Sequence, residues 1–143
     1  MPIDPTSLDV FSDAIRRVAL RMTELAGARG AAHSALSKQE LLAIGVLGLH
    51  GAVRMGEVAE RLGVRQSAVT PLVDRLEDQG LVRRRRSETD RRVWLVELTE
   101  QGVQVHADED AVYRQAAAEM LAPLDLDEQR ALVRLLEKMS MAE

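Results

Sequence analysis

Six arginines lie within residues 81–98 of a chain that is acidic overall. Only three acidic residues lie in the same segment, whereas the whole chain of 143 residues has a formal net charge of -4. Arginine side chains neutralise phosphates, and a local basic patch keeps its potential within a Debye length of ~8 Å even on an acidic protein. The pattern therefore predicts a polyanionic partner, and double-stranded DNA is the one we expect.

These arginines belong to a predicted β-hairpin that covers about residues 81–98. The runs "LVRRRR" and "RVWLVEL" favour strands, and the polar "SETDR" joins them. Side chains alternate along a strand, which puts Arg84 and Arg86 on one face and Arg83 and Arg85 on the other. Only some of them can therefore meet the same DNA strand. The alternative is a solvated, charged hairpin that protects its edges against aggregation.

The loop of this hairpin carries the residues best placed to enter a minor groove. Arg91 and Arg92 fall at the tip, and Asp90 can brace one of them by an ion pair. Trp94 alternates with Val96 along the second strand, so we expect it in the core of the hairpin.

A helix-turn-helix is predicted immediately before the hairpin, at residues 55–80. The small Ala59 lets two helices cross closely, and Gly63 permits the backbone of the turn. The second helix, at about residues 66–79, would lie in a major groove and present its N-terminal residues to base edges. Arg75, further along, is suited to a phosphate or an ion pair. The alternative is an ordinary helical corner. The residues expected near the bases are Arg65, Gln66, Ser67 and Thr70.

Two features of this motif are unusual. Neither helix begins with a Ser or Thr cap, so Ser67 or water is expected to serve at the start of the second helix. Pro71 falls inside that helix, where proline deletes a backbone hydrogen bond and tends to bend the axis. The bend should be small if the helix begins near Ser67.

Helices flank the motif on both sides. Ser37 and Glu40 form a capping box ahead of an apolar segment, Thr99 can cap a long helix after the hairpin, and Asp127 can cap the last one after Pro123. The predicted fold class is therefore mostly α with a small β-hairpin wing. We expect a single domain over residues 1–143, in which 37–98 form the winged helix-turn-helix and 1–36 and 99–143 supply dimerisation helices.

The terminal helices carry apolar stripes that exceed what one small winged-helix core can cover. Pairing between two chains would bury them, whereas in the alternative, a monomer, they would cover the chain's own core. A dimer would place two recognition helices about 34 Å apart, one turn of DNA. The stripe residues are Phe11, Ile15 and Val18 on the first helix and Leu132, Leu135, Leu136 and Met139 on the last.

Composition and residue spacing argue against several other classes of function. The chain has no cysteine and no apolar run of the ~18 residues needed to span a bilayer, so we expect a cytoplasmic protein that makes no membrane contact. His33, His50 and His106 lack the spacing of metal ligands, and we expect neither a metal nor a cofactor. There is no Gly-rich phosphate loop and no supported Ser, His and acid grouping, so an enzyme is not expected.

The segments "VAERLGVRQSAVTPLVDRLEDQGLVRR" and "DRRVWLVELTEQG" resemble the MarR (multiple antibiotic resistance regulator) family of bacterial transcription factors. The resemblance implies a homodimer, built from the first helix and the last two, that binds a pseudo-palindromic operator. It also implies that Gln66, Ser67 and Thr70 lie on the recognition helix and that Arg92 is the wing-tip arginine, braced by Asp90. Members of this family commonly respond to small organic ligands.

Two functions follow as hypotheses. The first is a dimeric, sequence-specific regulator of transcription, a repressor that a small-molecule effector releases. The second is a winged-helix module that contacts a protein rather than DNA, for which the acidic carboxy-terminal third would suit a basic partner. The hairpin arginines discriminate between them, because only the first hypothesis requires Arg92 for binding a duplex.

Overall fold

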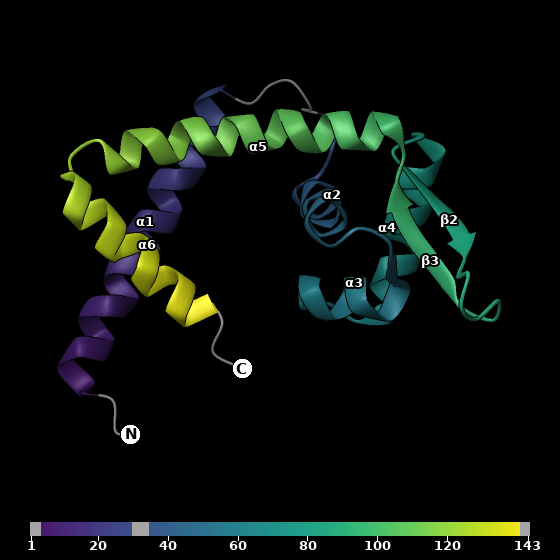
Figure 1. Cartoon of the computed structure of the whole chain (residues 1–143), viewed down its shortest axis with the longest axis horizontal. Coiled ribbons are helices and arrows are strands. Elements are labelled where there is room, and N and C mark those ends of the chain that lie inside the picture. Colours follow the sequence, from purple (N-terminus) through teal and green to yellow (C-terminus); the bar gives the residue numbers. More distant parts are fainter. Residues whose placement is uncertain (1–3, 30–34, 141–143) are drawn as a thin grey trace. The chain divides into compact units, whose positions relative to one another are not determined.

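The computed structural model describes residues 4–29 and 35–140, which form helices and one small sheet (Figure 1). These residues divide into two compact units. Residues 35–110 form the first, which we call the winged unit, and residues 4–29 with 111–140 form the second, which we call the terminal-helix unit. The predicted fold class, mostly α with a β wing, is confirmed. No helix in the described ranges is long and apolar enough to cross a membrane.

The winged unit contains one antiparallel sheet with the strand order β1-β3-β2. Sequence analysis predicted the hairpin of β2 and β3 but missed β1, because two residues are too few to show the two-residue period of a strand. Val53 of β1 pairs with Val96 of β3. The elements are α2 (Lys38–His50), β1 (Val53–Arg54), α3 (Met55–Leu62), α4 (Gln66–Asp78), β2 (Val82–Arg86), β3 (Trp94–Leu98) and the first turns of α5 (Glu100–Leu121).

Aliphatic side chains from every element of the winged unit form its core. Helix α2 buries one face, through Ile44 and Leu47, and packs against α3, α4 and β3. The recognition helix contributes an inner stripe of four apolar residues, all of them buried. They are Val69, Leu72, Val73 and Leu76, and they join Val58 and Ala59 of α3 and Val82 and Val96 of the sheet.

Local signals in the sequence set the helix ends. The Ser37 side chain accepts from the Glu40 amide at 3.2 Å, and the Glu40 carboxylate accepts from the Ser37 amide at 2.7 Å, so the predicted capping box is confirmed. Gly63 ends α3 with a left-handed φ of 64°, a conformation that costs glycine nothing. Thr99 caps α5, since its hydroxyl accepts from the Gly102 amide at 3.1 Å.

The terminal-helix unit comprises α1 (Pro5–Arg29), the second half of α5 and α6 (Leu126–Ser140). The predicted break at Pro123 is confirmed, but the cap of α6 is Asp125 rather than Asp127. The Asp125 carboxylate accepts from the amides of Asp127 and Glu128, both at 2.9 Å. The cap of α6 therefore lies two residues closer to Pro123 than the sequence analysis placed it.

Candidate nucleic-acid interface

The recognition helix α4 begins directly after a tight turn from α3. The Val64 amide donates to the Ala59 carbonyl at 3.0 Å, and Arg65 takes an extended conformation as the residue before the helix. The Arg65 side chain makes no capping hydrogen bond, and the Ala68 amide instead donates to the Arg65 carbonyl at 2.9 Å. The expectation that Ser67 supplies the cap therefore gains no support from the structure.

The two sides of α4 differ sharply in exposure. Gln66, Ser67 and Thr70 are exposed, as is Arg65 just ahead of them. The opposite side is the buried stripe described above. Three side chains that can donate and accept hydrogen bonds thus share one solvent-facing surface at the N-terminal end of the helix, which is the part of a recognition helix that reaches base edges.

Helix α4 continues through Pro71 to Asp78 without interruption. Proline has no amide hydrogen, so the carbonyl one turn earlier, that of Ser67, lacks its helical donor. Ser67 and Pro71 are both exposed, which leaves this carbonyl open to water or to a ligand. The sequence analysis expected a small effect for a helix starting near Ser67, and the observed start at Gln66 agrees with that condition.

Arg75 lies on the same helix but is held by an ion pair. Its Nε lies 3.1 Å from Oε1 of Glu40, a buried carboxylate at the start of α2. The hydrogen bond from the Ser37 amide, aided by Arg75, holds the pKa of Glu40 below its ordinary value of 4.5. Of the two roles expected for Arg75, phosphate contact or ion pair, the structure therefore shows the second.

Three of the four arginines of β2 are also paired with carboxylates. Arg84 points toward α4, where its guanidinium forms ion pairs with Asp74 and Glu77. Arg83 and Arg85 lie on the other face of the hairpin, as alternation predicts, and each donates from Nε to Glu97 at 2.8 Å. Glu97, opposite Arg83 in the register, was not expected to neutralise both. The hairpin therefore offers a DNA partner less free charge than its arginine count indicates.

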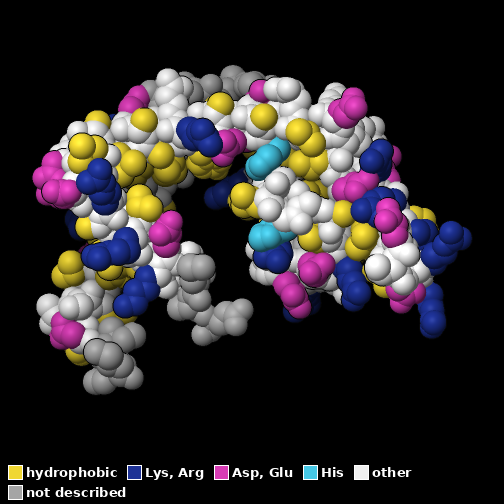
Figure 2. Space-filling view, in the orientation of Figure 1, with side chains coloured by type: hydrophobic (Ala, Val, Ile, Leu, Met, Phe, Trp, Pro, Cys, Tyr) yellow, Lys and Arg dark blue, Asp and Glu magenta, His cyan; other side chains and the backbone are white. Residues whose placement is uncertain are grey.

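The tip of the wing carries two exposed arginines, Arg91 and Arg92. The Val93 amide donates to the Asp90 carbonyl at 2.9 Å, which makes Arg91 and Arg92 the two central residues of a β-turn. Asp90 Oδ1 accepts from the Arg92 amide at 3.0 Å and lies 3.8 Å from Arg92 Nε. The brace that the resemblance implies is thus present, yet the Arg92 side chain remains 96% exposed. Figure 2 shows Lys and Arg side chains reaching outward at this end of the winged unit.

The exposure of Trp94 differs from the prediction. We predicted it in the core of the hairpin, but it is 46% exposed, whereas Val96 on the same strand is fully buried. The Arg86 guanidinium lies over the indole ring, 4.0 Å from its centroid. A strand that alternates cleanly can still leave the ring at its outer end in solvent, because the core of the winged unit lies under the inner end of the sheet.

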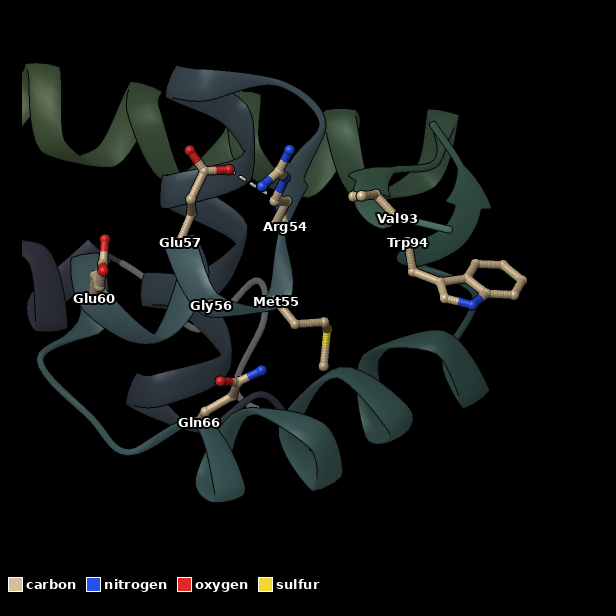
Figure 3. A pocket seen from close by; sticks show the side chains of 8 residues that line it. All are labelled: Arg54, Met55, Gly56, Glu57, Glu60, Gln66, Val93 and Trp94. Atoms are coloured by element: carbon tan, nitrogen blue, oxygen red, sulfur yellow. Dashed lines mark hydrogen bonds between the residues drawn. The ribbon is translucent and has the colours of Figure 1, made fainter. Parts of the chain in front are cut away.

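Sequence reasoning also missed a shallow pocket beside the start of α4. It has a volume of about 470 Å³ and is lined by residues of β1, α3, α4 and the outer end of the wing (Figure 3). Arg54 and Glu57 meet there, where the Arg54 amide donates to Glu57 Oε2 at 3.0 Å. The Trp94 ring points away from these side chains. The unrecognised strand β1 is the reason that this pocket was missed.

The histidines have structural surroundings. His50 Nε2 lies 3.1 Å from the Arg61 guanidinium, and the His106 ring packs so closely on Gly48 that a Cβ there would overlap it. His33 lies outside the described residues. No group of three or more potential metal-binding side chains occurs among the residues that the structure describes.

The stripes predicted for dimerisation are exposed in the single chain. Their members lie on α1 and α6 of the terminal-helix unit, and their side chains are between 37% and 54% exposed. Helix α6 has no buried residue at all. The members are Phe11, Ile15, Val18, Leu132, Leu135, Leu136 and Met139.

Comparisons with known proteins agree with this geometry. Residues 34–93 match the model of the MarR family. The HTH-type transcriptional repressor MdtR of Bacillus subtilis is 41% identical over 63 residues, which are 44% of this chain and 41% of MdtR. This match therefore spans less than half the length of that relative.

Solved structures extend the likeness to nearly the whole chain. A MarR family protein from Bacillus stearothermophilus superimposes with a TM-score of 0.84 at 22% identity, over 97% of this chain and 96% of that one. BpsR of Bordetella bronchiseptica, whose structure concerns the regulation of its DNA binding by 6-hydroxynicotinic acid, gives 0.68 at 25% identity, over 91% and 98%. Residues 34–93 are thus similar to the MarR family, and the described residues share the winged helix-turn-helix fold of a MarR family protein.

Proposed function

We propose that the chain forms a homodimer that binds DNA in a sequence-specific way, with α4 in the major groove and the wing at the adjacent minor groove. The observation that carries this proposal is the presence of two exposed polar surfaces in the winged unit. One is the row of Gln66, Ser67 and Thr70 on α4, and the other is the turn of Arg91 and Arg92. Amide and hydroxyl side chains read base edges, while arginines at a loop tip suit the minor groove.

We propose that fewer arginines contact DNA than the number of arginines in the wing and in α4 indicates. Arg65 is exposed at the start of α4 and suits a phosphate. Arg84 and Arg75 are held by carboxylates within the winged unit, so they fix the interface rather than touch the duplex. Asp90 orders the turn that carries Arg92. Affinity should therefore depend on few phosphate contacts and on base contacts from α4.

The exposed stripes of α1 and α6 support the proposal of a homodimer. A soluble monomer rarely exposes a contiguous apolar surface of that kind, and a second copy offers the same surface in return. Two recognition helices related by a two-fold axis would read a pseudo-palindromic operator. The carboxy-terminal acidic charge of the chain would then lie on the dimerisation helices rather than on the DNA-binding surface.

We propose further that the regulator is a repressor in the cytoplasm and that a small organic acid releases it from DNA. Support comes from two relatives, since MdtR is a repressor and the DNA binding of BpsR is regulated by 6-hydroxynicotinic acid. We propose no enzymatic activity and no cofactor for this chain. A panel of aromatic carboxylic acids, added to a preformed complex with DNA, should contain a compound that lowers the bound fraction.

Selection from genomic DNA tests the function directly. The purified chain is incubated with sheared genomic DNA of its source, and bound fragments are recovered at several salt concentrations and sequenced. We expect a near-palindromic sequence whose enrichment persists above about 0.15 M salt. Random fragments that are lost as salt rises would contradict the proposal, because they would show charge-driven binding alone.

The same experiment addresses the second candidate, a winged-helix module that binds protein. That candidate predicts no retention of DNA at any salt concentration. An Arg92→Ala chain is the matched control, because the change removes one exposed charge from the tip while Arg83 to Arg85 keep their partners.

A further inference from the structure

The outermost residue pair of the hairpin makes two contacts that reach into the wing tip. Arg86 and Trp94 are paired at the last position of the β2–β3 ladder. The Arg86 guanidinium stacks 4.0 Å above the indole centroid, and its NH1 donates to the Arg91 carbonyl at 2.9 Å. One side chain therefore joins the ring of β3 to the backbone of the turn that carries Arg91 and Arg92.

Two other hydrogen bonds also order the loop. The Ser87 amide donates to the Val93 carbonyl at 2.9 Å, which closes the base of the loop. The Asp90 carboxylate fixes the Arg92 amide. Arg86 is the donor that the structure gives the Arg91 carbonyl. The peptide between Arg91 and Arg92 is thus held at its N–H by Asp90 and at its carbonyl by Arg86, and removing Arg86 would leave only the first of these two hydrogen bonds.

We propose that Arg86 and Trp94 form a strut that orders the wing-tip turn, so that both act as positioning residues for DNA binding by Arg91 and Arg92. This inference rests on the proposed function. A turn that is ordered before binding loses less conformational freedom when it binds, and the affinity rises accordingly. The strut differs from a phosphate contact, because the Arg86 guanidinium contacts the Trp94 ring and the Arg91 carbonyl rather than DNA.

Arginine and tryptophan suit this role by their shapes. A guanidinium is planar, so it can lie flat on an indole face while its edge donates hydrogen bonds, whereas the ammonium of lysine is a point charge that stacks less well. The ring is held by its strand but half exposed, so it offers a free face without disturbing the core. Arg86→Lys and Trp94→Phe are therefore the conservative variants, and each should keep part of the effect.

The strut can be measured without DNA. Trp94 is the only tryptophan of the chain, so its fluorescence reports on this ring alone. Arg86 covers one face of the ring, and Arg86→Ala should therefore raise the acrylamide quenching constant, with Arg86→Lys between the two. Arg83→Ala is the matched control, since Arg83 pairs with Glu97 and should leave the quenching unchanged. Equal quenching in the original chain and in Arg86→Ala would overturn the strut.

The positioning role is measured on a labelled copy of a fragment recovered in the genomic selection. We expect Arg86→Ala and Trp94→Leu each to weaken binding about fivefold, and the double variant to weaken it no further than either alone. In an Arg91→Ala, Arg92→Ala chain, Arg86→Ala should have no effect. The salt slope should stay unchanged in Arg86→Ala.

A direct phosphate contact by Arg86 predicts a different pattern. The salt slope would then fall by about one, the loss would persist in the chain without Arg91 and Arg92, and Trp94→Leu would bind normally. That pattern would overturn the positioning role. Failure of the unsubstituted chain to bind any fragment would overturn the proposed function and the positioning role together, while the quenching experiment would still decide whether the strut exists.

Discussion

Glu77 of the recognition helix binds Arg84 of the wing twice. Its Oε1 accepts from the Arg84 backbone amide at 3.1 Å, and its Oε2 accepts from the Arg84 guanidinium, which also pairs with Asp74. These bonds fasten the wing to the helix that is proposed to lie in the major groove. They are partly buried, which makes them stronger than bonds between fully exposed side chains.

Arg84→Ala should therefore loosen the wing. We expect the free energy of unfolding to fall by about 1 to 2 kcal/mol, because two carboxylates lose a charged partner. DNA affinity should fall as well, with little change in its salt dependence, since Arg84 is not a proposed phosphate contact. Urea unfolding and fluorescence anisotropy measure the two effects. A salt slope reduced as much as in Arg92→Ala would contradict this role for Arg84.

Gly102 is required by a close approach between α5 and the wing. A Cβ at this position would overlap the Leu81 carbonyl, which also accepts from the Thr99 amide at 3.0 Å. Gly102→Ala should lower the free energy of unfolding by about 1 to 3 kcal/mol despite the better helix propensity of alanine.

Gly45 in α2 is the matched control for this substitution. Apart from its chain neighbours and the backbone of the same helix, no atom lies within 4 Å of a Cβ placed there. Gly45→Ala should be neutral or should raise the free energy of unfolding by up to about 1 kcal/mol, because alanine favours a helix. Thermal unfolding compares the two variants, and equal changes in both would reject the steric explanation.

Glu40 should make stability depend on pH. Its pKa in the folded chain lies below the ordinary value of 4.5, so the carboxylate stabilises the fold above that value, and the contribution is lost as the pH falls through the folded pKa. Glu40→Gln should thus lower the free energy of unfolding by about 1 to 2 kcal/mol at pH 7 and by less at pH 3.5. Urea titrations at both pH values test this, with exposed Glu24→Gln as the control. A difference that is the same at both pH values would contradict it.

The stripes of α1 and α6 predict a dimer in solution. Sedimentation should give twice the chain mass of 15.8 kDa. The double change Leu135→Lys, Leu136→Lys should shift the mass toward one chain, because two charges would enter an apolar interface. Leu126→Lys, which lies off this stripe on the same helix, should remain a dimer. A monomeric original chain would refute the assignment of these stripes.

The winged helix-turn-helix at residues 37–98 was predictable because its signals are local. Gly63 and Gly80 mark positive φ values, and the Ser37 and Glu40 capping box needs only a spacing of three residues. Such signals survive in one sequence without knowledge of the rest of the fold. The recognition helix and the wing were therefore placed within a few residues of their observed bounds.

The pairing of charges was not predictable in the same way. Glu97 binds Arg83 and Arg85 across the sheet, and Asp74 reaches Arg84 from another element, so both pairings depend on how strands and helices pack. Counting arginines overestimated the free charge of the wing for that reason. The exposure of Trp94 likewise depends on where the core ends beneath the sheet, which periodicity alone does not reveal.

Comparing two arginines of the wing tests the proposed DNA interface most directly. Arg92 is exposed at the tip, whereas Arg83 is paired with Glu97, and replacing either by alanine removes one positive charge. On a recovered fragment, we expect Arg92→Ala to weaken binding about tenfold or more and to reduce the salt slope by about one, while Arg83→Ala changes both little. Equal losses from the two substitutions, or undiminished binding by Arg92→Ala, would contradict the proposed interface.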